Sequence, residues 1–266
     1  MNSLKSFFIQ TKFTLVNKIC LAAIFIALGM ILNQVICIKE IPIIPFVKIS
    51  LGGPALIILS SLLLGPFFGA LVGGAVDFLG YLIFDFKTFA YFPQITLTYI
   101  LLGFVPGFLF ALVKNIKSKK LMMGIEISFM SLLFIGLTLF FIFNNSVKLY
   151  GKIYTFELYQ KIFLLSSLFV LCGLTILITL LMDRIYSKRE IKTNLILNPY
   201  QISFVCFIVE ILIMVLFGTL MKGISFGFTM YPAILVCQII TMFINIPLNI
   251  CLISYILLLT KKYYSL

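Results

Sequence analysis

A single acidic residue, Asp77, stands inside an otherwise apolar stretch and is the first candidate for chemistry in this sequence. It continues a ladder of glycines, Gly65, Gly69 and Gly73, spaced four residues apart. On a helix this spacing puts all four residues on one face, and glycines there let a neighbouring helix come close. We therefore expect the carboxylate to face other helices. There it either serves a transport pathway or binding site, or only holds a neighbouring helix by hydrogen bonds.

Uncharged hydrogen-bonding groups gather just after Phe92, at the start of the next apolar stretch. Gln94, Thr98 and, within one turn, Tyr99 lie at one end of the predicted helix. Such groups beside aromatic rings suit a planar, polar, aromatic ligand. The alternative is a belt of aromatic residues where the helix meets the membrane surface. We favour the ligand because such a belt has no need of Thr96 and Thr98.

The composition places these polar groups in a membrane. Hydrophobic residues make up 62% of the chain and charged residues 11%, with a mean hydropathy of +1.21. That leaves too little polar surface to cover a soluble globule. Apolar stretches of the ~20 residues that a ~30 Å hydrocarbon core requires follow one another through nearly the whole chain. We therefore predict an all-α, polytopic membrane protein with a single integral membrane domain over residues 1–266.

Eight membrane segments are expected, near residues 15–36, 50–64, 66–84, 93–113, 121–144, 161–182, 202–221 and 231–259. The second is short, with Pro54 in its first turn and the Gly65-Pro66 corner at its end. Segments two and three could therefore form a helical hairpin that dips into the membrane and returns. Most Lys and Arg residues fall on one side of this arrangement, which predicts a multi-pass protein of the cell membrane with both termini cytoplasmic.

Two further acids lie within apolar segments. Glu126 is near the inner end of its segment, where water is close, and Glu210 lies deeper with no obvious partner in the sequence. If Asp77 and Glu210 bound protons or sodium ions, the chain would be a stand-alone secondary transporter, which is the alternative function. Such transporters often have two similar halves, and the glycine ladder before Asp77 has no counterpart after residue 121.

Enzymatic chemistry has little support in this sequence. It contains no histidine, and its six cysteines are scattered singly through apolar segments without a C-x-x-C pair. With no clustered acids and no nucleophile beside a base, we expect no enzyme activity, no cofactor and no metal ion. A nucleic-acid partner is not expected either. The net charge of +12 would lie in loops beside lipid head groups, and no soluble domain exists to carry a basic patch.

Three blocks of sequence together resemble the substrate-binding S component of energy-coupling factor (ECF) vitamin transporters, most closely the folate type. The first block is Lys48-Ile49-Ser50-Leu51-Gly52, and the second is Gly65-Pro66-Phe67-Phe68-Gly69-Ala70-Leu71-Val72-Gly73 with Asp77 and Gly80. The third is Phe92-Pro93 with Thr96-Leu97-Thr98 and Gly103. In the last helix, Pro247-Leu248-Asn249 is similar to a Pro-x-Gln of that family.

The resemblance implies six helices and a vitamin site that opens outward, between the loops after helices one, three and five. It also implies docking on a transmembrane coupling subunit and two ATPases. The chain has no G-x-x-x-x-G-K-[ST] motif, so ATP hydrolysis must come from those partners. Ala23 and Ala27 form a flat face on the first helix and match the small residues with which the family meets its coupling subunit.

Within this framework the candidate substrate-binding residues are Lys48, Ser50, Asp77, Phe92, Gln94, Thr96, Thr98 and Tyr99. Lys48 would lie at the outer mouth, where a cation can meet a carboxylate of folate, the expected ligand. Another flat heterocyclic vitamin or a nucleobase-like compound stays open, because Gln94 and Ile95 stand where the folate type commonly has glycine and an aromatic residue. Residues 121–183 are expected to be an inserted two-helix hairpin, absent from the six-helix pattern.

Overall fold

The computed structural model describes residues 14–38, 49–50, 52–86, 90–113, 116, 118–144, 146–149, 152–188 and 198–264. Within these residues, seven helical spans are long and apolar enough to cross a membrane. They are α2 (Leu15–Met30) with η1 (Ile31–Val35), α4 (Pro66–Gly80) with η2 (Tyr81–Asp85), α5 (Pro93–Val113), α6 (Lys119–Phe143), α7 (Leu158–Lys188), α8 (Pro199–Val209) with η3 (Glu210–Phe217) and α9 (Gly218–Phe226), and η4 (Phe228–Met230) with α10 (Tyr231–Tyr264). The prediction of an all-α polytopic membrane protein is confirmed.

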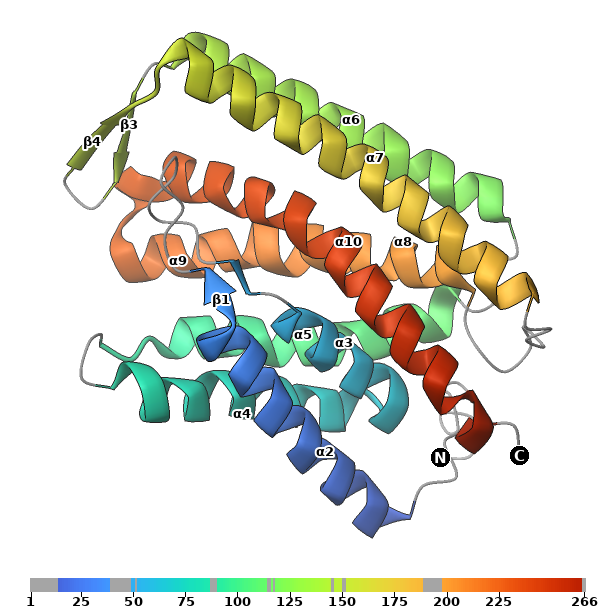
Figure 1. Ribbon diagram of the computed structural model, residues 1–266. Helices are drawn as coiled ribbons and strands as arrows, with labels where there is room; N and C mark the ends of the chain where they lie inside the picture. The colour runs from blue at the N-terminus through green and yellow to red at the C-terminus, as the bar shows by residue number, and fades with distance from the viewer. Residues whose placement is uncertain are drawn as a thin grey trace.

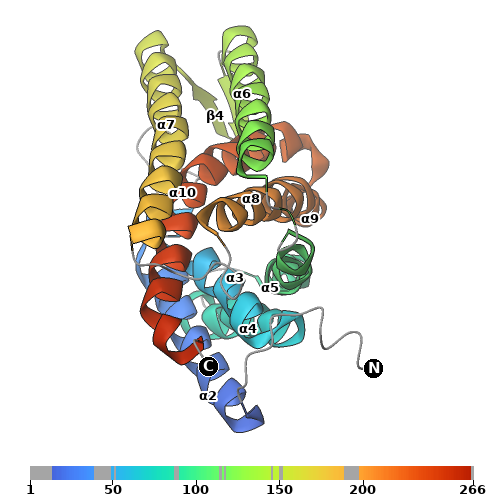
Figure 2. The ribbon, with the colours of Figure 1, turned by 90° about the vertical axis from the view of Figure 1, so that its right-hand side faces the viewer.

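The helices lie in three neighbouring groups (Figure 1). Helices α2 to α5 form one group, α8 to α10 form the middle one, and α6 and α7 lie along the far edge, as the view turned by 90° also shows (Figure 2). Helix α10 contacts α3 of the first group and α7 of the last. The polar site residues of α4 and α5 therefore belong to the group that is most distant from α6 and α7.

Two short antiparallel strand pairs lie at one end of the helices (Figure 1). Strand β1 (Cys37–Ile38) pairs with β2 (Ile49–Ser50), and Cys37 stands opposite Ser50. Strand β3 (Ser146–Leu149) pairs with β4 (Lys152–Thr155) between α6 and α7. The first pair places Ser50 close to η1, at the end of α2.

Helix α3 (Gly53–Leu64) is the short second segment, and its 12 residues cannot cross a ~30 Å core. Every one of them is buried, because α2, α4, α5 and α10 surround the helix. A helix that is apolar all round is suited to such an interior position. Gly65 then turns the chain into α4 with φ = 97°, a conformation that favours glycine, and Pro66 begins the next helix.

Helices α4 and α5 pack very closely, and their contact depends on the predicted glycine ladder. A Cβ added at Gly69 would overlap the Gly103 carbonyl oxygen, and one added at Gly103 would overlap the Gly69 carbonyl oxygen. At Gly73 the added atom would overlap the Tyr99 carbonyl oxygen. Close backbone approach of this kind is how small residues hold membrane helices together. It also fixes the position of Asp77 on α4 relative to the first turns of α5.

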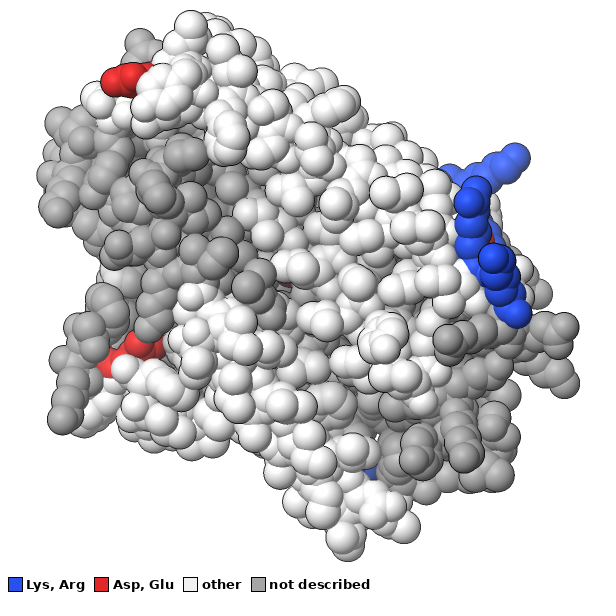
Figure 3. Space-filling model, in the orientation of Figure 1, with Lys and Arg blue, Asp and Glu red and all other residues white. Residues whose placement is uncertain are grey.

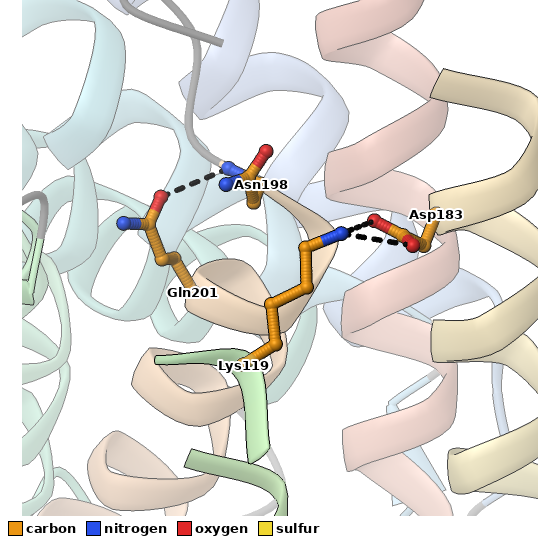
Figure 4. A network of polar contacts seen from close by, with 4 residues as sticks. All are labelled: Lys119, Asp183, Asn198 and Gln201. Atoms are coloured by element: carbon orange, nitrogen blue, oxygen red, sulfur yellow. Dashed lines mark hydrogen bonds and ion pairs between the residues drawn. The ribbon is translucent and has the colours of Figure 1, made fainter. Parts of the chain in front are cut away.

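Two separate sets of polar contacts lie near one another at the end where α6 begins (Figure 4). Lys119 Nζ lies 2.7 Å from Asp183 Oδ1, so the start of α6 is paired with the end of α7. Gln201 Nε2 donates to the Val113 carbonyl oxygen at 3.1 Å, and its Oε1 accepts from the backbone N–H of Asn198 at 2.9 Å. Lys and Arg side chains gather at this end on the face that Figure 3 shows.

Candidate ligand-binding site

A directed chain of hydrogen bonds links the last turn of α4 to the first turn of α5. Thr96 Oγ1 donates to Asp77 Oδ2 at 2.6 Å, and the Tyr91 hydroxyl lies 2.7 Å from the same Thr96 oxygen. Because a threonine hydroxyl carries one proton, which goes to Asp77, Tyr91 must be the donor to Thr96. Thr96 is buried and Asp77 is half-buried. Asp77 therefore faces a neighbouring helix, as its place in the glycine ladder predicts.

The π-helical segment η1, which continues α2, adds two buried amide side chains that are not among the predicted site residues. Asn33 is 1% exposed, and its Nδ2 lies 3.2 Å from the Tyr99 hydroxyl. Gln34 is also buried and packs beside Gly80, where an added Cβ would lie 3.2 Å from Gln34 Nε2. The one sequence signal for them is a pair of amides at the end of an apolar run.

The start of α5 presents a hydrogen-bond acceptor without a donor. Gln94 Oε1 is buried and has no hydrogen-bond partner among the described residues. Thr98 Oγ1 instead donates to the Gln94 carbonyl oxygen at 3.2 Å, and its methyl group faces Gly218 of α9. Buried polar atoms are nearly always paired, so the orphan oxygen points to a donor that comes from a ligand or water.

Aromatic rings surround these polar groups. The Phe92 ring lies 5.0 Å from that of Phe226, which brings the end of α9 to the start of α5. Tyr91 contacts Tyr81 with 5.1 Å between ring centroids, and Phe78 with 5.6 Å. These separations are typical of interacting aromatic pairs. The rings give the polar residues an apolar border, as sites for small planar ligands usually have.

The structure brings some of the predicted site residues together and leaves others apart. Asp77, Thr96 and Tyr99 lie where α4, α5 and η1 meet, whereas Phe92 and Thr98 contact α9 and Gln94 lies one turn before Thr98. Ser50 is buried in β2, beside η1. Lys48 lies outside the described residues.

The two alanines predicted to meet a partner lie on the outside of α2. Ala23 and Ala27 are exposed, whereas Ala22, Phe25 and Gly29 are buried and turn to the opposite side of the helix. Gly29 packs against Val76 of α4. The small-residue face is therefore not used for packing within the described part of the chain.

Comparison with family models matches residues 13–187 to the family described as ECF-type riboflavin transporter, S component. The match covers more than half of the 266 residues and runs from α2 to α7. No curated protein and no solved structure matches the chain.

Proposed function

The chain belongs to the family of ECF-type riboflavin transporter S components, and from this premise we propose that it binds riboflavin at the site around Asp77 and Thr96. Members of the family are substrate-binding subunits of transporters, so the chain is a transport protein and not an enzyme. The seven long apolar helices described above make it a multi-pass membrane protein.

The chemistry of the site supports riboflavin over folate. Its described polar groups are a carboxylate, two amides and several hydroxyls, namely Asp77, Asn33, Gln94, Thr96, Tyr91 and Tyr99. Riboflavin is uncharged and carries ring N–H and ribityl hydroxyl donors, which a carboxylate and an orphan amide oxygen can accept. Folate carries carboxylates that Asp77 would repel. The cation that favoured folate in the sequence analysis, Lys48, lies outside the described residues.

A substitution at Asp77 tests this assignment. Replacing it by asparagine keeps the shape and removes the charge, so one charge-assisted hydrogen bond to the ligand is lost. We expect the affinity of the purified Asp77→Asn variant for riboflavin to fall about ten- to a hundredfold, the equivalent of ~1.5–3 kcal/mol. Quenching of flavin fluorescence during titration measures this.

Glu126→Gln is the matched control. The Glu126 carboxylate accepts a hydrogen bond from Oγ of Ser203, a residue of α8, at 2.7 Å, and it takes no part in the site. The riboflavin affinity of this variant should equal that of the wild-type chain. Equal riboflavin affinity in Asp77→Asn and the wild type would remove Asp77 from the site. Tight binding of folate together with no binding of riboflavin would overturn the ligand.

We also propose the partners and the orientation. The exposed face of Ala23 and Ala27 would dock on a transmembrane coupling subunit, and two ATPases would supply the energy.

The protein would lie in the cell membrane with the end that carries the Lys and Arg side chains of Figure 3 on the cytoplasmic side, because the positive-inside rule places such residues there. Residues 121–183 would be an insertion, since α6 and α7 lie outside the other helices (Figure 2). The vitamin would then enter from the side of β1 and β2.

A further inference from the structure

Glu210 and Asn249 meet where α10 packs against η3, and Asn245 lies one turn before Asn249 on α10; we call these three buried residues the Glu210 cluster. Glu210 is 0% exposed, and the two asparagines are almost as deeply buried. Asn249 Nδ2 donates to Glu210 Oε1 at 2.9 Å. Asn245 and Asn249 are four residues apart, so both amides lie on one face of α10.

Three oxygen atoms of this cluster lack any donor. Glu210 Oε2, Asn245 Oδ1 and Asn249 Oδ1 are buried and have no hydrogen-bond partner among the described residues. No described Lys or Arg forms an ion pair with Glu210. The ionisable side chains that interact with Glu210 electrostatically include Tyr99 and Cys206, and neither carries a positive charge. A carboxylate inside a membrane protein needs such a charge or a proton.

The helix itself is irregular at this point. The eight residues of η3, which begin at Glu210, are π-helical. In a π-helix the hydrogen bonds run from i to i+5, which shifts the backbone carbonyls out of the α-helical pattern. Such segments are rare and are often found at functional sites. The irregular turn therefore begins at the residue that carries one of the three unpaired oxygens, Glu210 Oε2.

We propose that Glu210, Asn245 and Asn249 bind one alkali-metal cation, Na⁺. Carboxylate and amide oxygens are the donors that hard cations prefer. The single carboxylate balances one positive charge, whereas a divalent ion would leave a net charge in the membrane interior. The prediction of no metal ion was based on the lack of clusters of His, Cys or acidic residues. A site made of one acid and two amides is of a different kind, so that argument does not exclude it. Bound Na⁺ would hold η3 against α10.

Thermal unfolding of the purified chain without vitamin tests this, so the result does not depend on the proposed ligand. We expect the melting temperature to rise when NaCl replaces choline chloride at constant ionic strength. The rise should grow with the logarithm of the Na⁺ concentration above the dissociation constant and reach about 3–6 °C at ten times that constant. Equilibrium binding of radioactive sodium should give close to one ion per chain.

Two variants and one control decide the interpretation. Glu210→Gln and Asn245→Ala should each abolish the sodium-dependent rise, and Glu210→Gln, which removes the buried charge, should fold without sodium. Glu126→Gln, at a buried carboxylate that Ser203 already pairs, should keep the rise. Equal melting in NaCl and choline chloride, or a sodium effect that survives Glu210→Gln, overturns the proposal. A melting temperature that depends on pH through Glu210 but not on Na⁺ also overturns it, because a proton then neutralises the carboxylate.

Discussion

The double substitution Ala23→Trp with Ala27→Trp should abolish ATP-driven uptake of the vitamin by the assembled transporter. Both alanines are exposed on one face of α2, and two indole rings there would hold a partner helix away. Binding of riboflavin to the isolated chain should stay within about twofold of wild type, since both alanines are exposed whereas Asn33 is buried against Tyr99, so ring bulk on the outside of α2 changes no contact of Asn33. Uptake assays and titrations of the same variant measure the two effects.

Ile24→Trp with Leu28→Trp is the matched control for this result. These two positions are also exposed on α2, but they lie about 100° further round the helix. The control should transport normally. Normal uptake by the Ala23 and Ala27 variant, or equal loss in both variants, would contradict a docking face at the alanines.

Gly103→Ala should strongly destabilise the protein. The added methyl group would overlap the backbone of Gly69, and a backbone cannot move aside as a flexible side chain can. Overpacking of this kind costs about 1–3 kcal/mol or more, so we expect the melting temperature to fall by about 5 °C or more. Riboflavin binding should weaken too, because the same contact positions Asp77 against Thr96.

Gly136→Ala provides the comparison, because apart from the adjacent backbone of its own helix no described atom lies within 4 Å of the position of its added Cβ. Alanine is also the better helix former, by up to ~1 kcal/mol. The control should therefore melt at or slightly above the wild-type temperature. If the Gly103→Ala variant melts at the same temperature as the Gly136→Ala control, the close packing of α4 on α5 is refuted.

The positions of the helices could be predicted from the sequence because a membrane requires long apolar runs whose ends are visible as polar or proline-containing corners. The glycine ladder likewise indicated the face on which α4 packs, since spacing alone determines it. Pro54 and the Gly65-Pro66 corner also indicated that the second segment is short. Its complete burial could not be predicted, because that depends on four other helices surrounding it.

Partners across helices could not be predicted, because nothing local in a sequence determines which helices meet. Asn33 pairs with Tyr99 across 66 residues, and Glu210 with Asn249 across 39. Glu126 was expected close to water, yet it is buried against Ser203 because α8 packs on α6 at that depth. The sequence blocks resemble the folate type of S component, whereas the family model that matches the chain is the riboflavin one.

The most direct test of the central claim is accumulation of labelled riboflavin by liposomes that contain the purified chain. An S component has no energy source of its own, whereas a secondary transporter carries its coupling acids within the chain. We predict that the chain alone binds riboflavin but does not accumulate it under a proton or sodium gradient, and that accumulation begins when the coupling subunit, both ATPases and ATP are added. Gradient-driven accumulation by the chain alone, lost in Asp77→Asn or Glu210→Gln, would contradict this account and establish a stand-alone secondary transporter.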